Sequence, residues 1–173
     1  MKQEQVIDVE LKLLNDMQVF IVGTPYETAE VLDLKRLNKQ IIENKQIMDA
    51  ILGIGKGWFN HPVVKSYKNH FHWLYYYNLC LFWYSRGDKP MAKKMSDKAN
   101  DIKPNFHIEE YFNQMKRRLY TKNNKYYSQW AELGESDCNW YWSDEENKFI
   151  KYINGKRIEL YGKLSNKRSR NSW

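Results

Sequence analysis

The stretch that decides the fold is TPYETAEVLDLKRLNKQIIENKQIMDAIL, residues 24–52. Three start signals agree here, because Thr24 offers a hydroxyl cap, Pro25 suits the first helical position and Glu27 completes a capping box. Apolar residues then recur at helical spacing to the end of the stretch, where the glycine-rich segment GIGKG follows. The pattern predicts one long amphipathic helix over the whole stretch and a turn after it.

Working outward, the chain predicts further helices and two short β elements. Asn154-Gly155 lies between two β-prone runs and suits the positive-φ positions of a tight hairpin. Upstream, the β-prone runs VIDVELKLL and MQVFIV within residues 5–22 are separated by a turn-forming pair, which predicts a second hairpin. Trp140 and Trp142 share one side of any extended segment, so one of them is expected to seal the core. Further helices are expected from Pro62 to about Arg86, from Met91 to Ala99 and from Ile108 to Lys122.

Charge is segregated along the chain of 173 residues, whose formal net charge is +7. Residues 34–72 carry seven basic and two acidic side chains, and residues 73–128 carry eleven basic and five acidic ones. A positive middle of this kind favours phosphate-bearing partners. A set of solvated helix faces is the alternative interpretation of the same pattern.

Cysteine use and hydropathy bound the location of the protein. Cys80 and Cys138 are the two cysteines, far apart and outside metal-ligand spacing, which favours a reducing intracellular or cytoplasmic setting and no metal. The first residues lack the apolar run of a signal peptide. The most apolar window, FHWLYYYNLCLFWY at 71–84, has 14 residues and is too short to span a bilayer. It predicts a buried helix, and no membrane role is expected.

A carboxylate among cations is the first candidate for chemistry. On the predicted long helix, Asp33, Arg36 and Gln40 fall on one stripe, beside Lys35 and Lys39. An ordinary salt-bridged helix surface is the simpler alternative for this stripe.

Two motifs give these residues a family context. The pattern L-D-x-x-R-L-x-K-Q at 32–40, followed by G-W-x-N-H-P at 57–62, resembles the pyrimidine-dimer DNA glycosylase family of the endonuclease V type, known from viruses and bacteria. The resemblance resumes at Arg117–Lys122 and in the aromatic segments 126–127 and 140–142. It implies a mainly α fold with one compact helical domain.

The resemblance also divides the chain. The expected parts are an N-terminal extension with a strand at residues 1–16, a glycosylase-like helical domain at 17–142, and a β-hairpin with a basic tail at 143–173. The fold is therefore expected to be mainly α, with a small β element from the N-terminal extension and the C-terminal hairpin.

The resemblance implies a DNA-repair glycosylase and lyase that extrudes a base from duplex DNA and cleaves the glycosidic bond through an imine. Asp33 takes the place of the family's essential glutamate. The family's nucleophile is the α-amino group of a processed N-terminus, but here the matching start lies near Met17, behind sixteen residues. Lys35 and Lys39 are therefore candidate substitute amines, since lysines also form imines.

The expected partner is damaged or modified duplex DNA, and no cofactor or metal is expected. His61 is also expected to cap the helix that begins at Pro62. The alternative is a catalytically inactive family member that binds nucleic acid, a nucleotide or a protein. The residues expected to contact DNA are Arg36, Gln40, Asn60, His61, Arg117, Arg118 and Lys122.

Overall fold

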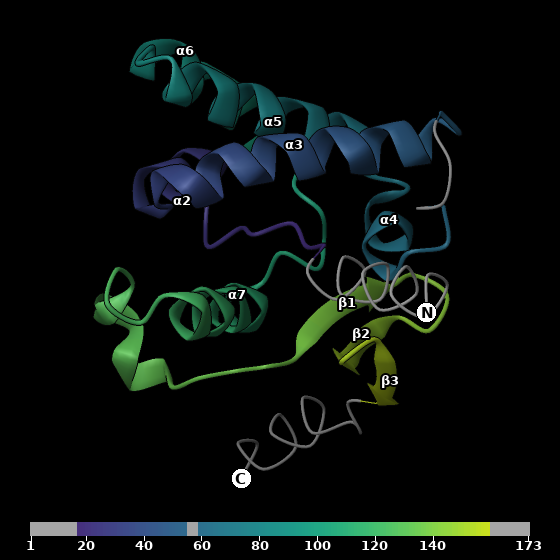
Figure 1. The fold of residues 1–173 in the computed structure, drawn as a ribbon. Coiled ribbons are helices and arrows are strands. Elements are labelled where there is room, and N and C mark those ends of the chain that lie inside the picture. Colours follow the sequence, from purple (N-terminus) through teal and green to yellow (C-terminus); the bar gives the residue numbers. More distant parts are fainter. Residues whose placement is uncertain (1–16, 55–58, 160–173) are drawn as a thin grey trace, which may run out of the picture.

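A computed structural model describes residues 17–54 and 59–159 of the protein (Figure 1). The described part is mainly helical and ends in a three-stranded antiparallel sheet, which confirms the predicted fold class. The elements, in chain order, are α2 (Pro25–Val31), α3 (Leu34–Ile51), α4 (Pro62–Tyr67), α5 (Phe71–Ser85), α6 (Lys89–Asn100), α7 (Glu109–Lys122), the 3₁₀ helix η1 (Ser128–Leu133), β1 (Asn139–Ser143), β2 (Lys148–Ile153) and β3 (Lys156–Glu159).

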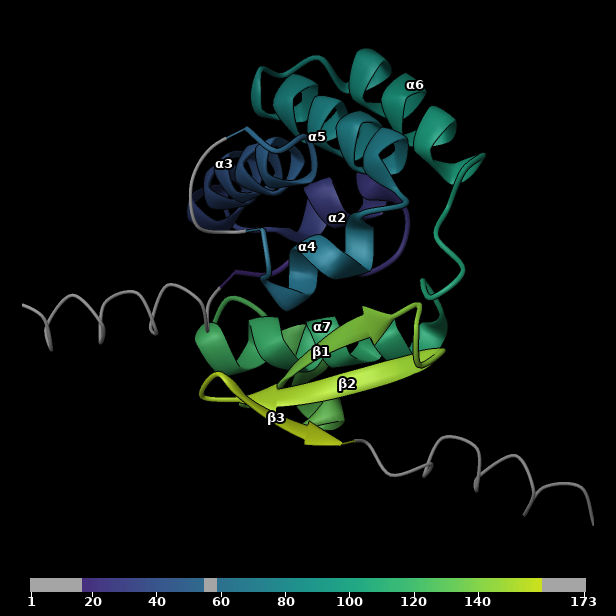
Figure 2. The same cartoon turned by 90° about the vertical axis from the view of Figure 1, so that its right-hand side faces the viewer.

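The elements form two halves that meet at a buried segment. Helices α2, α3, α5 and α6 make up one half, with α2 packed on α5 and α6, and α7 and the sheet make up the other (Figures 1 and 2). Helix α4 contacts both α3 and β1 and so lies between the halves. Residues 17–22 run between the halves, and Val19, Phe20 and Ile21 have no exposed surface. This segment therefore links the two halves of the core.

The strand predicted for MQVFIV is wrong for residues 17–22, which are extended but belong to no ladder in the described structure. Side chains satisfy the backbone here instead of a neighbouring strand. The N–H of Phe20 donates to Oε1 of Gln40 at 3.0 Å, and its carbonyl accepts from the hydroxyl of Tyr77. The N–H of Val22 donates to Oγ1 of Thr28 at 3.1 Å. The first half of that predicted hairpin, and with it the strand of the N-terminal extension, lies outside the described residues.

The predicted long helix is two helices. Its start is confirmed, because Thr24 Oγ1 accepts from the N–H of Glu27 at 3.1 Å. The helix is interrupted at Asp33, whose ψ of 154° is extended and whose Oδ2 accepts from the N–H of Arg36 at 3.3 Å. Aspartate has a low propensity for helix interiors and is a favourable N-cap residue. Asp33 therefore lies between α2 and α3 and caps the start of α3. The sequence had predicted that Asp33, Arg36 and Gln40 share one helical stripe, and this prediction is wrong because Asp33 lies before the helix that carries the other two.

The second predicted helix also divides, into α4 and α5. The cap at its start is confirmed, since Nδ1 of His61 accepts from the N–H of Val63 at 3.0 Å. After Tyr67 the chain turns through Asn69, whose side chain donates to Asp144 at 3.0 Å, and α5 begins at Phe71. Asparagine favours turns over helix interiors, which accounts for a break at this point. The helices predicted at 91–99 and 108–122 correspond to α6 and α7 and are confirmed.

The C-terminal hairpin is confirmed, with φ of 50° at Asn154 and 74° at Gly155. The additional strand β1 pairs with β2, so that Tyr141 lies opposite Ile150. Tyr141 is the buried member of the aromatic trio on β1, whereas Trp140 and Trp142 are half-buried. Trp142 stacks on Phe106 with ring centroids 5.8 Å apart. Both faces of the strand are therefore covered by other parts of the protein.

Two further features bear on function. Both cysteines are buried and free. Within residues 17–54 and 59–159, none of the helices combines the length and apolarity that a bilayer span requires, and no cluster of three metal-binding side chains occurs.

Candidate functional site: a buried glutamate beside Met17 and Gln18

Glu43 is the carboxylate at the centre of the site. It lies on α3 with 7% of its surface exposed, one turn after Lys39, whose Nζ is 3.8 Å from Oε1. The backbone N–H of Gln18 donates a hydrogen bond to it. Burial raises the pKa of Glu43 to about 7, although Lys39, the Gln18 N–H and the cations Arg36 and Lys122 all act to lower it. This carboxyl group therefore exchanges its proton near neutral pH.

The chain opposite Glu43 is held from three sides. From α3, Nε2 of Gln40 donates to the carbonyl of Gln18 at 3.0 Å, and Oε1 of Gln40 accepts from the N–H of Phe20. From β1, the hydroxyl of Tyr141 donates to the carbonyl of Met17 at 3.0 Å. From α5, Tyr77 donates to Phe20. These bonds give Met17 and Gln18 a defined backbone position beside the glutamate.

Two cations lie close to this segment of backbone. The guanidinium carbon of Arg36 lies 5.5 Å from the centre of the Phe20 ring, and Nζ of Lys122 lies 6.0 Å from the same centre. Nη1 of Arg36 is buried and has no hydrogen-bond partner in the described chain. A buried donor without a partner is costly, so this nitrogen favours an anionic ligand.

Asp33 is placed differently from Glu43. One of its oxygens caps α3, and the other accepts from the hydroxyl of Tyr127, whose ring stacks on Trp130 with centroids 5.4 Å apart. Both carboxylate oxygens are therefore occupied in joining the α2–α3 junction to the segment that follows α7. Asp33 remains within the same region, but its contacts are those of a structural residue.

The other predicted residues fall into two groups. Lys35 and Asn60 are exposed, and Lys39 and Lys122 are partly exposed near Glu43. Gln40 is 1% exposed, and both protons of its amide nitrogen are bonded, one to Gln18 and one to Asn44 at 2.7 Å. The amide of Gln40 is therefore engaged within the protein, and its contact with DNA stays a prediction.

The basic residues on α7 and the histidine before α4 are also engaged internally. Arg118 is 8% exposed and donates to Asn139 at 3.2 Å and to the carbonyl of Ser136 at 3.1 Å. Nε of Arg117 donates to the carbonyl of Leu133 at 2.9 Å, and this residue is half-buried. His61 is buried as the cap of α4. Of the predicted set, the structure brings Arg36, Lys39 and Lys122 together.

Sequence reasoning missed Glu43 and the backbone of Gln18. A signal was present, because Gln40, Glu43 and Asn44 fall on the side of the helix that also carries Leu37 and Ile47. Three polar residues on an apolar helix face predict a buried polar site. Gln18, which lies 25 positions before Glu43 in the chain, has no sequence signal that marks it as the partner of this site.

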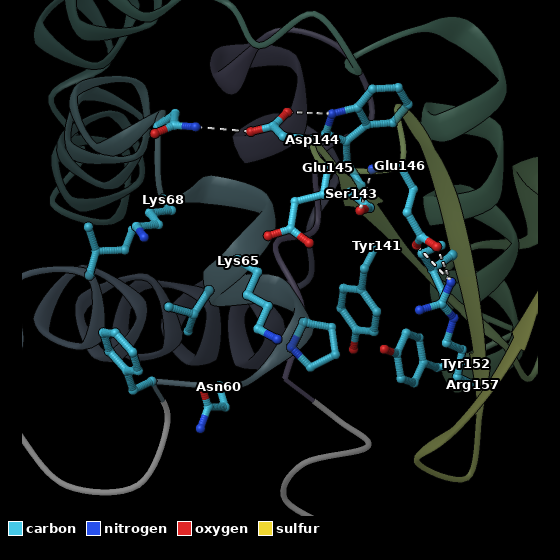
Figure 3. A pocket seen from close by; sticks show the side chains of 17 residues that line it. Asn60, Lys65, Lys68, Tyr141, Ser143, Asp144, Glu145, Glu146, Tyr152 and Arg157 are labelled. Atoms are coloured by element: carbon cyan, nitrogen blue, oxygen red, sulfur yellow. Dashed lines mark hydrogen bonds and ion pairs between the residues drawn. The ribbon is translucent and has the colours of Figure 1, made fainter.

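A hollow of about 540 Å³ lies on the far side of Tyr141, between α4 and the β1–β2 turn (Figure 3). Lys65 and Lys68 line one wall, and Asp144 and Glu145 line the other. Charges of both signs make this hollow a poor match for a polyanion. Glu43 and the cations around it are not among the residues that line this hollow.

Fold and site together define a mainly helical protein in which a buried acid of near-neutral pKa faces a fixed stretch of backbone and a group of cations. Residues 17–96 of the chain match the family model described as pyrimidine dimer DNA glycosylase, which confirms the suspected family over this segment. The match begins at Met17, beside Glu43, and ends before α7 and the sheet. Comparison with curated proteins and with solved structures finds no match.

Proposed function

We propose that the protein is a DNA glycosylase and lyase that acts on damaged or modified bases in duplex DNA through an imine intermediate. The observation that supports this most is the contact between Glu43 and the N–H of Gln18 at the point where the family match begins. An acid that titrates near pH 7 is well suited to move protons to and from an attacking amine.

The nucleophile in this proposal is the α-amino group of Met17, exposed when residues 1–16 are removed. Met17 is 4% exposed and its carbonyl is bonded to Tyr141, so cleavage before this residue keeps its packing, whereas cleavage after it would lose both. An α-amino group titrates roughly 2.5 pKa units below an ordinary lysine side chain, so at neutral pH far more of it is the neutral, nucleophilic form.

The chemistry follows from that amine. Its nitrogen forms a bond to C1′ of the sugar while the bond from C1′ to the base breaks, and the electron pair leaves with the base, which takes up a proton. The nitrogen then loses a proton, and its lone pair forms the imine as the C1′–O4′ bond breaks and O4′ takes up a proton to become a hydroxyl. Loss of a proton from C2′ then expels the 3′ phosphate. We assign to Glu43 the role of accepting and returning the amine's proton.

Lys39 is the substitute amine that the geometry favours if Met17 is not freed. Its Nζ lies 3.8 Å from Glu43, whereas Lys35 is exposed on α3 and has no contact with that glutamate among the described residues. Like the α-amine, Lys39 is an amine next to a carboxyl group that can accept and return its proton, which is what imine formation requires.

Phosphate contacts are proposed for the cations around the site. Arg36, with its unpartnered Nη1, and Lys122 both lie close to the Phe20 ring in the segment that carries the amine. We add Lys39 and the exposed Asn60 to this surface and leave out Gln40 and Arg118, because their polar groups are bonded within the protein.

Borohydride trapping on ultraviolet-irradiated and abasic duplex DNA tests the proposal. A covalent adduct is expected, and peptide mapping should place it on Met17, in protein whose N-terminus mass spectrometry shows to begin there. An adduct on Lys39 would establish the substitute nucleophile. Absence of an adduct on every lesion, from folded protein that binds DNA, would refute the enzymatic proposal.

Two variants separate the carboxylates. Glu43→Gln is expected to remove most trapping while leaving DNA binding intact, because the amide keeps the size of the side chain and cannot exchange the proton. Asp33→Asn should reduce trapping much less, since an amide oxygen can still cap α3. The reverse outcome would assign the catalytic carboxylate to Asp33.

A chain that retains residues 1–16 supports a second function. The nitrogen of Met17 is then a peptide amide, which is not nucleophilic. In that form the cations Arg36, Lys39 and Lys122 would serve a module that binds nucleic acid without cleaving it. Binding of duplex DNA without trapping, by protein that begins at Met1, would support this alternative.

A further inference from the structure

Strand β1 contacts the proposed amine segment although it lies outside the matched residues 17–96. The hydroxyl of Tyr141 donates to the carbonyl of Met17 at 3.0 Å, and Nε2 of Gln18 donates to the carbonyl of Trp140 at 3.3 Å. We propose that β1, chiefly through Tyr141, is a positioning element that holds the amine of Met17 at Glu43. This inference rests on the proposed function and names a residue of that same site.

The geometry restricts the amine strongly. The peptide group between Met17 and Gln18 is planar. Tyr141 holds its oxygen, and Glu43 accepts a hydrogen bond from its N–H, so the plane is fixed at both edges. Rotation about the Cα–C bond of Met17 is then the motion left to the amine, and the buried side chain of that residue opposes it. An amine held in this way reacts from a small set of positions, which is the condition for a high effective concentration.

Tyr141 is itself held rigidly. Its backbone is paired with Ile150 of β2. Its ring meets His61 edge-on at 5.6 Å and Tyr152 at 5.3 Å between centroids. Burial raises the pKa of Tyr141 above its usual range, so the hydroxyl remains a donor throughout the physiological range.

The packing also assigns His61 a part beyond its cap. The His61 ring packs against the ring of Tyr141, whose hydroxyl holds Met17. Figure 3 shows Tyr141 and Tyr152 side by side at the edge of the hollow. The position of the amine therefore depends on residues of the sheet as well as on α3.

The first test uses the full chain and needs no DNA. In a nitrogen-15 NMR titration, the Gln18 amide signal is expected to follow the ionisation of Glu43 near pH 7, because the two groups are hydrogen-bonded. Tyr141→Phe is expected to reduce the amplitude of that change at least twofold. Tyr152→Phe is the matched control, since it alters the neighbouring ring without removing the bond to Met17. An unchanged amplitude in Tyr141→Phe would overturn the proposal.

The second test uses the protein that forms the borohydride adduct. Tyr141→Phe is expected to slow single-turnover imine formation about tenfold, equivalent to ~1.4 kcal/mol, with the KM for DNA unchanged. A purely structural role would instead raise KM or lower the melting temperature without changing the rate of folded protein, and that result would refute positioning.

Two further outcomes are distinguishable. If wild-type protein forms no adduct but Tyr141→Phe uncouples the Gln18 amide from Glu43, the proposed function fails and the positioning stands. If Tyr141→Phe does not fold, Gln18→Leu is the substitute variant, because it removes the other bond to β1. It should also reduce the amplitude of the pH response of the residue 18 amide, by less than Tyr141→Phe. No change in that variant would overturn the role of β1.

Discussion

Glu43→Gln should make the protein more stable above neutral pH, although it is expected to disable the site. In the folded chain the pKa of Glu43 is about 7, against 4.5 for an ordinary glutamate. Between these two values the folded state binds more protons than the unfolded state, so wild-type stability falls as the pH rises through this window. At 1.36 kcal/mol for each pKa unit, the loss reaches about 3 kcal/mol above pH 7.

The glutamine variant has no proton to lose, so it escapes this decline. Its free energy of unfolding should equal that of wild type within about 1 kcal/mol at pH 4.5 and exceed it by about 3 kcal/mol at pH 8. Urea denaturation at several pH values measures the difference directly. Glu145→Gln, at an exposed position on the β1–β2 turn, is the matched control and should follow wild type. A stability difference between variant and wild type that does not change with pH, or a variant less stable than wild type at pH 8, would refute the raised pKa of Glu43 in the folded protein.

Two other predictions concern the surroundings of the site. Tyr127→Phe removes a hydroxyl that donates to the carboxylate of Asp33, and urea denaturation should show a loss of about 1.5–3 kcal/mol, whereas an unchanged midpoint would contradict the link between the α2–α3 junction and the segment after α7. For duplex DNA, Arg36→Ala and Lys122→Ala should each lower the slope of log affinity against log salt by about 0.9, because each removes one phosphate contact. Arg118→Ala should leave that slope unchanged, since its guanidinium is bonded within the protein, and a changed slope would place this side chain on DNA.

The turns and caps were determined by the sequence, because their physics is local. Thr24 and His61 each bond a backbone N–H within three residues, and Asn154-Gly155 supplies the backbone conformations of its own turn. The motifs between residues 32 and 62 were likewise enough to indicate the family that the comparison confirms for residues 17–96.

Asp33 shows where local reasoning gave the wrong structure. A helical pattern through residues 24–52 and a good N-cap at position 33 compete, and sequence alone does not say which prevails. The hydroxyl of Tyr127, 94 positions away, bonds Asp33 in its capping conformation. A distant contact thus accompanies the break, and it removes Asp33 from the stripe that had made it a catalytic candidate.

The composition of the candidate site was decided by the tertiary structure. Glu43 meets the N–H of Gln18 because residues 17–22 cross the core, and Tyr141 reaches Met17 from a strand 124 positions further along the chain. Hydropathy and spacing describe neighbours along one element, whereas burial of an acid and the bonds that hold a backbone depend on which elements pack together. The sequence therefore determined the helical class, the caps and the hairpin, and indicated the family that residues 17–96 match. The packing of α3 and β1 on one buried segment decided which carboxylate faces the proposed amine.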